Sequence, residues 1–309
     1  MQDRKIRIGT RGSALALAQA REVGRRLRDA HGLPEGQLEI VAIKTSGDRI
    51  QDRPLSEVGG KGLFTKELED ALLARDIDLA VHSMKDMPTV LPEGLAIAAF
   101  LPREDVRDAF ISKKYDSLAA LPPGAVVGTS SLRRQAQVKR FRPDLRIIDF
   151  RGNVDTRLRK IEDGVADATL LACAGLKRLG LHDRITAPID TAIMLPAIAQ
   201  GAIGIEVHAD DEATAALLGP LNDETTALCV AAERAFLARL DGSCRTPIAG
   251  LARLEKGHLA FRGQILTPDG AQSHETRRDG LPQEAMRMGE DAAAELLARA
   301  GPDFLTRRG

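Results

Sequence analysis

The feature that most constrains the fold is a repeated alternation of short apolar runs with segments of helical spacing. The first series has strand-like runs and helices at 5–10, 14–31, 38–44, 63–74 and 77–82. The second series has them at 125–129, 131–141, 146–150, 154–163, 168–172 and 176–179. Alternating strands and helices predict a parallel sheet with crossover helices. We therefore expect two α/β units.

The remaining segments predict a hinge and a third domain. A strand-like run at 201–208 can return to the first sheet if the chain crosses twice between the two units, and such a double crossing forms a hinge. Beyond residue 222, a helix over 224–240, strands near 248–254 and 258–266, and a helix over 283–300 predict a small α+β domain. We expect a discontinuous first α/β domain (1–102 and 200–219), a second α/β domain (105–195) and a C-terminal α+β domain (222–309).

Composition excludes several classes of protein. The 309 residues include 44 basic and 44 acidic side chains, one Tyr and no Trp, which disfavours general binding to nucleic acid or to an anionic membrane. There is no run of 18 apolar residues, and the first residues lack a signal core, so we expect a cytoplasmic protein. Cys173, Cys229 and Cys244 are odd in number and lack metal-binding spacing, so we expect neither disulfides nor a metal site.

Two strand-to-helix junctions share a pattern that suits an anion. Arg11 and Ser13 follow the first strand, and the segment Gly128–Arg134 repeats the arrangement of hydroxyl groups, helix start and arginine. The N–H groups of a helix start, a hydroxyl and an arginine together form a small anion site. Each junction alone also fits a capping serine beside a surface arginine. The recurrence favours one ligand that binds between the two units.

Five arginines are expected at or near the carboxyl ends of the strands, where open α/β sheets bind ligands. They are Arg11, Arg133, Arg134, Arg151 and Arg157. No phosphate-binding fingerprint is present, so the cluster predicts a ligand with several carboxylates. The alternative is that some of these arginines form ion pairs within the protein.

Titratable groups also follow the strand-like run that ends near His82. Pro88 interrupts regular structure, so Asp86 is expected to project from a loop, where it stabilises a developing cation or moves a proton. The alternative is an aspartate that accepts hydrogen bonds within a turn. His82 fits a buried, hydrogen-bonded histidine better than a catalytic one.

Two further loops allow two interpretations each. The Gly-rich stretch 44–62 is either a lid or disordered. Cys244 is either a buried, inert thiol or, beside Arg245, a thiol of lowered pKa that is positioned for covalent attachment. Cys173 and Cys229 lie in apolar contexts and are expected in the core.

Over nearly its whole length the chain resembles the porphobilinogen deaminase family. The motifs that carry the resemblance agree in order and spacing: Ile8–Arg11, Gly60–Glu67, His82–Asp86, Gly128–Arg134, Arg151–Val154, Leu195–Gly201 and Gly242–Cys244. The resemblance implies two lobes that look like a periplasmic binding protein, joined by a hinge, and a small third domain. It also implies a transferase with a dipyrromethane cofactor attached by a thioether to Cys244. Such enzymes condense four porphobilinogen molecules head to tail, release ammonia at each step and hydrolyse the product to hydroxymethylbilane.

By the same resemblance, Asp86 is the catalytic carboxylate. The cofactor-binding groups would be Asp86, Cys244, Lys85, Ser83, Thr129, Ser131, Arg133, Arg134, Arg151 and Gly152. The substrate-binding groups would be Arg11, Ser13, Lys61, Arg151, Arg157 and Gln200. We expect a monomer with porphobilinogen as its small-molecule partner.

Two positions depart from the family pattern. Ser243 stands where many members have Gly, which could stiffen the cofactor loop, and Glu57 stands where many have Lys, which puts one carboxylate contact in doubt. A non-catalytic module that binds a dicarboxylate is the competing class. The lack of an export signal and the carboxylate of Asp86, which would repel an anionic ligand, both oppose it.

Overall fold

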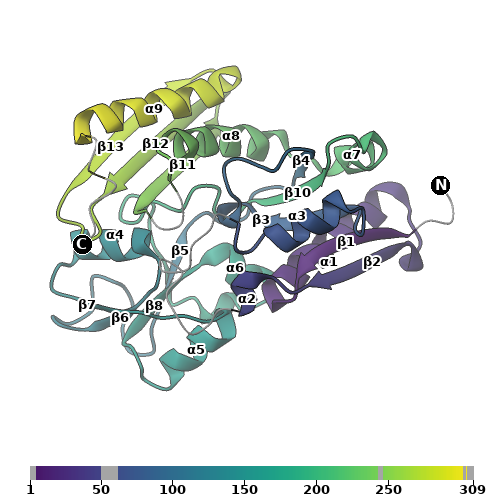
Figure 1. Ribbon diagram of the computed structural model, residues 1–309. Helices are drawn as coiled ribbons and strands as arrows, with labels where there is room; N and C mark the ends of the chain where they lie inside the picture. The colour runs from purple at the N-terminus through teal and green to yellow at the C-terminus, as the bar shows by residue number, and fades with distance from the viewer. Residues whose placement is uncertain (1–4, 50–61, 243–245, 302–303, 305–309) are drawn as a thin grey trace. The chain divides into compact units, whose positions relative to one another are not determined.

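The computed structural model describes residues 5–49, 62–242, 246–301 and 304. The described residues form two compact units (Figure 1). Among the described residues, unit 1 draws on 5–49, 62–104 and 201–227, and unit 2 draws on those of 105–200 and 228–304. The chain passes to unit 2 after residue 104, returns to unit 1 at residue 201 and passes to unit 2 again after residue 227.

Unit 1 is built on a five-stranded mixed sheet. Its strands, in spatial order, are β2 (Leu38–Ile43), β1 (Ile6–Arg11), β3 (Leu79–Ser83), β10 (Ile203–His208) and β4 (Leu95–Phe100). β1 runs parallel to β2 and β3, whereas β10 runs antiparallel to β3 and β4. The parallel arrangement predicted for the strands of the first series is confirmed by β1, β2 and β3, and the predicted return of 201–208 to this sheet is confirmed by β10. The returning chain pairs Ile203 with Ser83 at the carboxyl end of β3, so it runs in the opposite direction.

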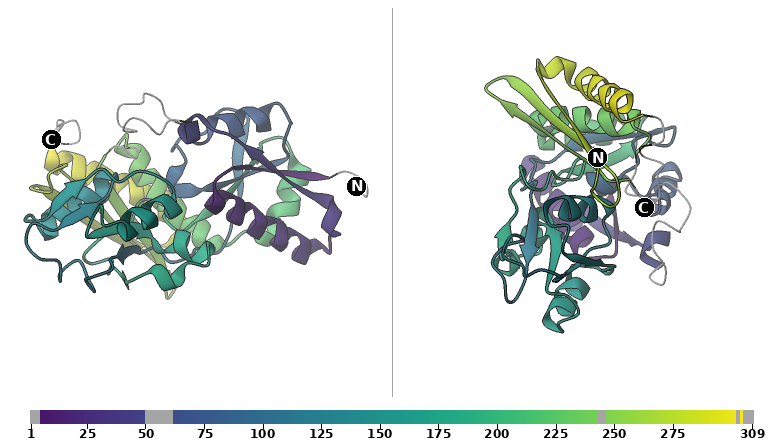
Figure 2. Two further views of the ribbon diagram at one scale, coloured as in Figure 1. Left: turned by 90° about the horizontal axis from the view of Figure 1, so that it is seen from below. Right: turned by 90° about the vertical axis from the view of Figure 1, so that its left-hand side faces the viewer.

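Helices cover both faces of this sheet (Figure 2, left). The longest is α1 (Ala14–His31), whose apolar face packs on Ile8, Leu79 and Val81. On the opposite face, α3 (Lys66–Leu73) packs on Ile77 and Ala80. The other helical segments of unit 1 are η1 (Glu35–Gln37), α2 (Ser46–Arg49), η2 (Met84–Asp86), α7 (Glu212–Leu218) and η4 (Gly219–Leu221).

The first part of unit 2 repeats this arrangement. Its strands, in spatial order, are β7 (Arg146–Ile148), β6 (Val126–Gly128), β8 (Ala168–Ala172), β5 (Asp108–Ile111) and β9 (Ala187–Pro188). Its helical segments are α4 (Leu132–Phe141), α5 (Val154–Glu162), α6 (Cys173–Arg178) and η3 (His182–Arg184). β6, β7 and β8 are parallel, but β5 is antiparallel to β8. The parallel arrangement predicted for the strands of the second series is therefore confirmed, and the antiparallel β5, which the sequence did not predict, makes this sheet mixed as well.

The C-terminal part of the chain forms a separate three-stranded sheet. After α8 (Glu224–Arg239), the strands β11 (Ile248–Glu255), β12 (His258–Leu266) and β13 (Ser273–Gly280) pair antiparallel in chain order. A short η5 (Pro282–Glu284) leads into α9 (Ala285–Ala300), which lies along β12 and β13 (Figure 1). The predicted fold class, two α/β units and a small α+β part, is confirmed.

A close contact in unit 1 fixes the turn that follows β3. Met84 begins η2, is buried, and donates its backbone N–H to the Ala202 carbonyl oxygen over 3.1 Å. A Cβ atom added to Gly204 of β10 would lie 2.1 Å from the Met84 Sδ. Only glycine at position 204 therefore leaves room for the Met84 side chain. The packing of Met84 on Gly204 and the hydrogen bond to Ala202 hold the turn that carries Lys85 and Asp86 against β10.

We predict that Gly204→Ala lowers the free energy of unfolding by about 1–3 kcal/mol, because the added methyl group overpacks the Met84 site. Gly219→Ala is the matched control, since a Cβ at Gly219 meets no atom within 4 Å and its φ is −48°. The measurement is urea unfolding of both variants beside the wild type. Equal stability of all three proteins would show that Met84 moves aside without cost.

Candidate functional site

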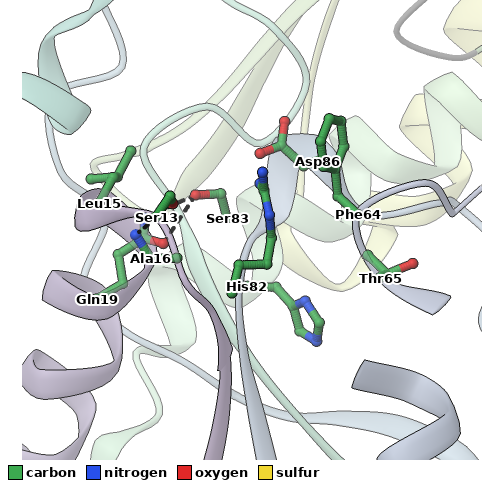
Figure 3. A pocket seen from close by; sticks show the side chains of 10 residues that line it. Ser13, Leu15, Ala16, Gln19, Phe64, Thr65, His82, Ser83 and Asp86 are labelled. Carbon is green, nitrogen blue, oxygen red and sulfur yellow. Dashed lines mark hydrogen bonds between the residues drawn. The ribbon is translucent and has the colours of Figure 1, made fainter. Parts of the chain in front are cut away.

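Unit 1 contains a pocket beyond the carboxyl ends of β1 and β3 (Figure 3). It is lined by Arg11, Ser13, Leu15, Ala16, Gln19, Phe64, Thr65, His82, Ser83 and Asp86. Four predicted site residues therefore meet here: Arg11, Ser13, Ser83 and Asp86. Lys85 is on the same turn as Asp86 but does not line the pocket.

The start of α1 gives the pocket its anion-binding side. Ser13 is the N-cap residue, and its Oγ accepts a hydrogen bond from the Ala16 N–H over 3.3 Å. The first turn of α1 contains no acidic residue, so the positive end of the helix dipole is not neutralised within the helix. Arg11 adds a full charge. Together these groups can bind a carboxylate, as the sequence predicts.

Neighbouring side chains orient the charged and hydroxyl groups. The Arg11 Cζ lies 4.2 Å from the centroid of the Phe64 ring, a cation–π contact. The Gln19 Nε2 and the Ser83 Oγ are 2.8 Å apart and hydrogen-bonded (Figure 3). Sequence reasoning missed Gln19 and Phe64. The signal for Gln19 is a polar residue on the buried face of α1, among Ala16, Ala20 and Val23.

In unit 2, the predicted hydroxyl groups lie at the start of α4. The Ser131 N–H donates to the Thr129 Oγ1 over 3.2 Å, and the Ser131 Oγ accepts from the Arg134 N–H over 3.5 Å. Thr129 is buried, and its backbone N–H donates to the Ile148 carbonyl oxygen. The segment therefore has the predicted form of strand, hydroxyl groups and capped helix start.

Arg133 and Arg134 point inward and share one carboxylate. The Arg133 Nη1 lies 2.8 Å from the Asp108 Oδ2, and the Arg134 Nη2 lies 2.7 Å from the Asp108 Oδ1. All three side chains are buried. Burial would raise the pKa of Asp108, but the charges of the two arginines outweigh burial and hold the pKa well below its usual range. For these two arginines, the structure has the internal ion pair that the sequence left open.

Gln200 joins the same cluster. Its Nε2 donates to the Asp108 Oδ1 over 3.1 Å and to the Val106 carbonyl oxygen over 2.8 Å. The Arg133 Nη1 also donates to the Leu195 carbonyl oxygen over 2.8 Å. Asp108 therefore fixes both the start of α4 and the segment 195–200.

Arg151 and Gly152 form the loop before α5. Gly152 has a φ of +118°, and a Cβ there would lie 2.6 Å from the Thr156 Cγ2, so the loop requires glycine. The Arg151 Nη1 is buried and has no hydrogen-bond partner among the described residues. Arg157 lies within the first turns of α5, in the same part of unit 2.

The cysteines divide into two groups. Cys173 and Cys229 are buried, as predicted, and burial raises the pKa of Cys173 to about 12, so this thiol is unreactive at neutral pH. Cys244 lies outside the described residues, as do Ser243, Glu57 and Lys61. Within the part of the chain that the structure describes, no group of three His, Cys, Asp or Glu side chains could hold a metal ion.

We predict that Asp108→Asn lowers the free energy of unfolding by about 3–5 kcal/mol at pH 7, because two buried guanidinium groups lose their charge partner. Asp144→Asn, which removes a partner of the surface residue Arg142, is the control and should have a much smaller effect. Because the folded pKa of Asp108 is depressed, its contribution is present above about pH 4 and is lost as the pH falls toward that depressed value. Urea unfolding between pH 7 and pH 3 measures both effects. Similar small losses in the two variants would contradict the role of Asp108.

Among the described helices, none combines the length and apolar character needed to cross a membrane.

Comparison with solved structures matches the methionine-binding protein MetQ, with a TM-score of 0.42 and 15% identity over 67% of this chain and 84% of that chain. Another is the periplasmic VFT2 domain of Bordetella pertussis BvgS, with a TM-score of 0.39 and 14% identity over 70% of this chain and 84% of that chain.

Comparison of sequences gives much stronger likenesses. The family model "Porphobilinogen deaminase, dipyromethane cofactor binding domain" matches residues 6–216, and the model of the C-terminal domain matches residues 227–298. The porphobilinogen deaminase of Paracoccus denitrificans (strain Pd 1222) is 60% identical over 299 residues, which cover 97% of this chain and 96% of the relative. That of Nitrobacter hamburgensis is 59% identical over 97% of this chain and 95% of the relative. The chain therefore belongs to the porphobilinogen deaminase family, transferases of tetrapyrrole biosynthesis that carry a dipyrromethane cofactor.

Proposed function

We propose that Asp86 is the catalytic carboxylate and that the unit 1 pocket is where a porphobilinogen ring loses ammonia. The observation that carries this proposal is the composition of the pocket. Asp86 is the one acidic side chain among the residues that line it, and it lies with Arg11 and the start of α1. A carboxylate in such a cationic site would weaken the binding of an anionic substrate unless it had a chemical task.

The chemistry supplies that task. When the protonated amino group of porphobilinogen leaves as ammonia, the methylene carbon keeps a positive charge that is conjugated to the pyrrole nitrogen. Arg11 would disfavour this charge, and Asp86 offsets it. A fixed opposite charge in a water-poor site is worth several kcal/mol, comparable to the roughly 2.7–4 kcal/mol lost with one oxyanion-hole donor. Asp86 can also accept the proton that is released when a new carbon–carbon bond forms.

The positively charged groups around the pocket suit a substrate that carries carboxylates. Each porphobilinogen carries an acetate and a propionate group. In unit 1, Arg11, Ser13 and the N–H groups of α1 are the proposed partners of these groups, with Lys61 as a further substrate contact. In unit 2, Arg151 and Arg157 are the proposed substrate-binding arginines. The buried, unpartnered Arg151 Nη1 supports this proposal.

The residues also fit the dipyrromethane cofactor, which has four carboxylates of its own. When bound, it supplies the pyrrole ring whose free carbon begins chain growth. We propose that the Cys244 sulfur holds it by a thioether, in agreement with the burial of Cys173 and Cys229. The groups proposed to bind its carboxylates and ring nitrogens are Ser83, Lys85, Asp86, Thr129, Ser131, Arg133, Arg134, Arg151 and Gly152.

For Arg133, Arg134 and Gln200, the proposal includes a second role. A guanidinium group has five N–H donors, so an arginine that pairs with Asp108 keeps donors for a ligand. The three side chains primarily hold the start of α4 and the segment 195–200 in place.

We further propose a cytoplasmic monomer, organised as the three expected domains, that binds porphobilinogen and neither nucleic acid nor membranes.

The attachment is tested by mass. We expect Cys244→Ser to fold but to have the mass of the bare polypeptide and no activity, because a hydroxyl is a far poorer nucleophile than a thiol near neutral pH. Intact mass spectrometry of the purified wild type and variant measures the difference, and Cys229→Ser is the control that should keep the added mass. A pyrrole adduct mapped to Cys173 or Cys229 would refute the assignment. A wild type without added mass would instead favour a carboxylate-binding module.

The catalytic role is tested at Asp86. We expect Asp86→Asn to lower turnover at least about a hundredfold with little change in thermal stability, because the charge and the proton acceptor are lost while the shape is kept. Asp86→Glu should retain more activity, since its charge survives. Initial rates of porphobilinogen consumption, with cofactor content checked by mass, give the answer. If the Asn variant equals the wild type or surpasses the Glu variant, Asp86 is a structural turn residue.

A further inference from the structure

His82 lines the unit 1 pocket and forms a buried pair of titratable side chains with Glu206, which the proposed chemistry does not use. The His82 Nε2 lies 2.9 Å from the Glu206 Oε2, and the two side chains are 4% and 0% exposed. In the pairing of β3 with β10, His82 is opposite Gly204 and Glu206 is opposite Ala80. The two side chains are therefore diagonal neighbours on one face of the sheet.

A third titratable group lies on the helix that covers this face. Glu69 of α3 is buried, and one oxygen of its carboxyl group, like one oxygen of Glu206, has no hydrogen-bond partner among the described residues. Burial raises the pKa of Glu69, and the charge of Glu206 adds to the increase. The carboxyl group that contacts His82 is that of Glu206, so its charge is the one that acts on the histidine.

That charge fixes the histidine. A carboxylate only accepts hydrogen bonds, so Glu206 places a proton on the His82 Nε2 and sets the orientation of the ring. Charged groups of neighbouring elements are Arg11 on β1 and Lys85 and Asp86 on η2. The carboxyl group hydrogen-bonded to His82 is that of Glu206.

The position of the pair connects it to catalysis. His82 lines the same pocket as Asp86 (Figure 3) and is followed by Ser83, the last residue of β3, and by the turn η2 that carries Asp86. Two apolar side chains would join β3 to β10 at lower cost, because burying charged groups requires their desolvation. A buried, hydrogen-bonded polar pair at this point therefore suggests a role beyond packing.

We propose that His82, held by Glu206, is a positioning residue that keeps the end of β3 and the Asp86 turn in the arrangement needed for reaction. The proposal rests on the proposed role of Asp86. It requires the charge of Glu206 and a donor at the place of the His82 Nε2, and it does not require Glu69 to be charged.

The experiment compares substitutions at these three buried positions. Glu206→Gln keeps the shape but removes the charge, and we expect kcat to fall at least about tenfold with KM within about twofold, because small displacements of catalytic groups have large effects on rate. Glu69→Gln is the matched control: it removes a carboxyl group that is also buried but is not the one hydrogen-bonded to His82, and it should keep kcat within about twofold. His82→Gln retains a donor near the Nε2 position and should exceed His82→Leu, which has similar size and no donor.

Two further measurements separate positioning from other causes. Thermal unfolding and circular dichroism confirm that each variant is folded at the assay temperature, and intact mass confirms that its cofactor content equals that of the wild type. Equal losses of kcat in Glu206→Gln and Glu69→Gln, an unchanged kcat in Glu206→Gln, or equal rates of the two His82 variants would overturn the proposal. The role of Asp86 is tested separately, by substitutions of Asp86 itself. None of these outcomes would therefore contradict the catalytic role of Asp86.

Discussion

The second unit depends on one buried negative charge. This charge is that of Asp108 on β5. Arg133 and Arg134 in the first turn of α4 donate hydrogen bonds to its carboxylate, and so does Gln200 in the segment that leads back to unit 1. A buried charge without partners would be strongly unfavourable, so these elements must stay together. The hydroxyl groups at the start of α4 therefore have fixed positions before any ligand binds.

In the first unit, too, a buried carboxyl group joins two elements. It is that of Glu206 on β10, and its hydrogen-bond partner is His82 on β3. In both sheets the carboxylate is on a strand that runs antiparallel to its neighbours, β10 in unit 1 and β5 in unit 2. The strands that break the expected parallel pattern thus supply the charges that organise the strand ends, where the candidate binding groups lie.

Local signals in the sequence explain which elements were predictable. The helix predicted over 14–31 agrees with α1 at both ends, because Ser13 caps its start and Gly32, with a φ of 63°, ends it. By contrast, β13 (Ser273–Gly280) was not predicted, since its residues are mostly polar and lack alternation. It is a strand because β12 pairs with it along its whole length and α9 packs against it. Only the tertiary structure supplies those contacts.

The distinction between local sequence signals and tertiary contacts also decides which residues of the site can be predicted from the sequence. Arg11, Ser13 and Asp86 follow strands in local motifs, so their meeting in one pocket was predictable, whereas Asp108 is 25 residues from Arg133 in the chain. The sequence therefore overstates the positive charge available to a ligand. Two arginines and one buried aspartate have a net charge of only one, so the proposed binding of a polycarboxylate in unit 2 would depend more on Arg151 and on the helix starts than the number of arginines suggests.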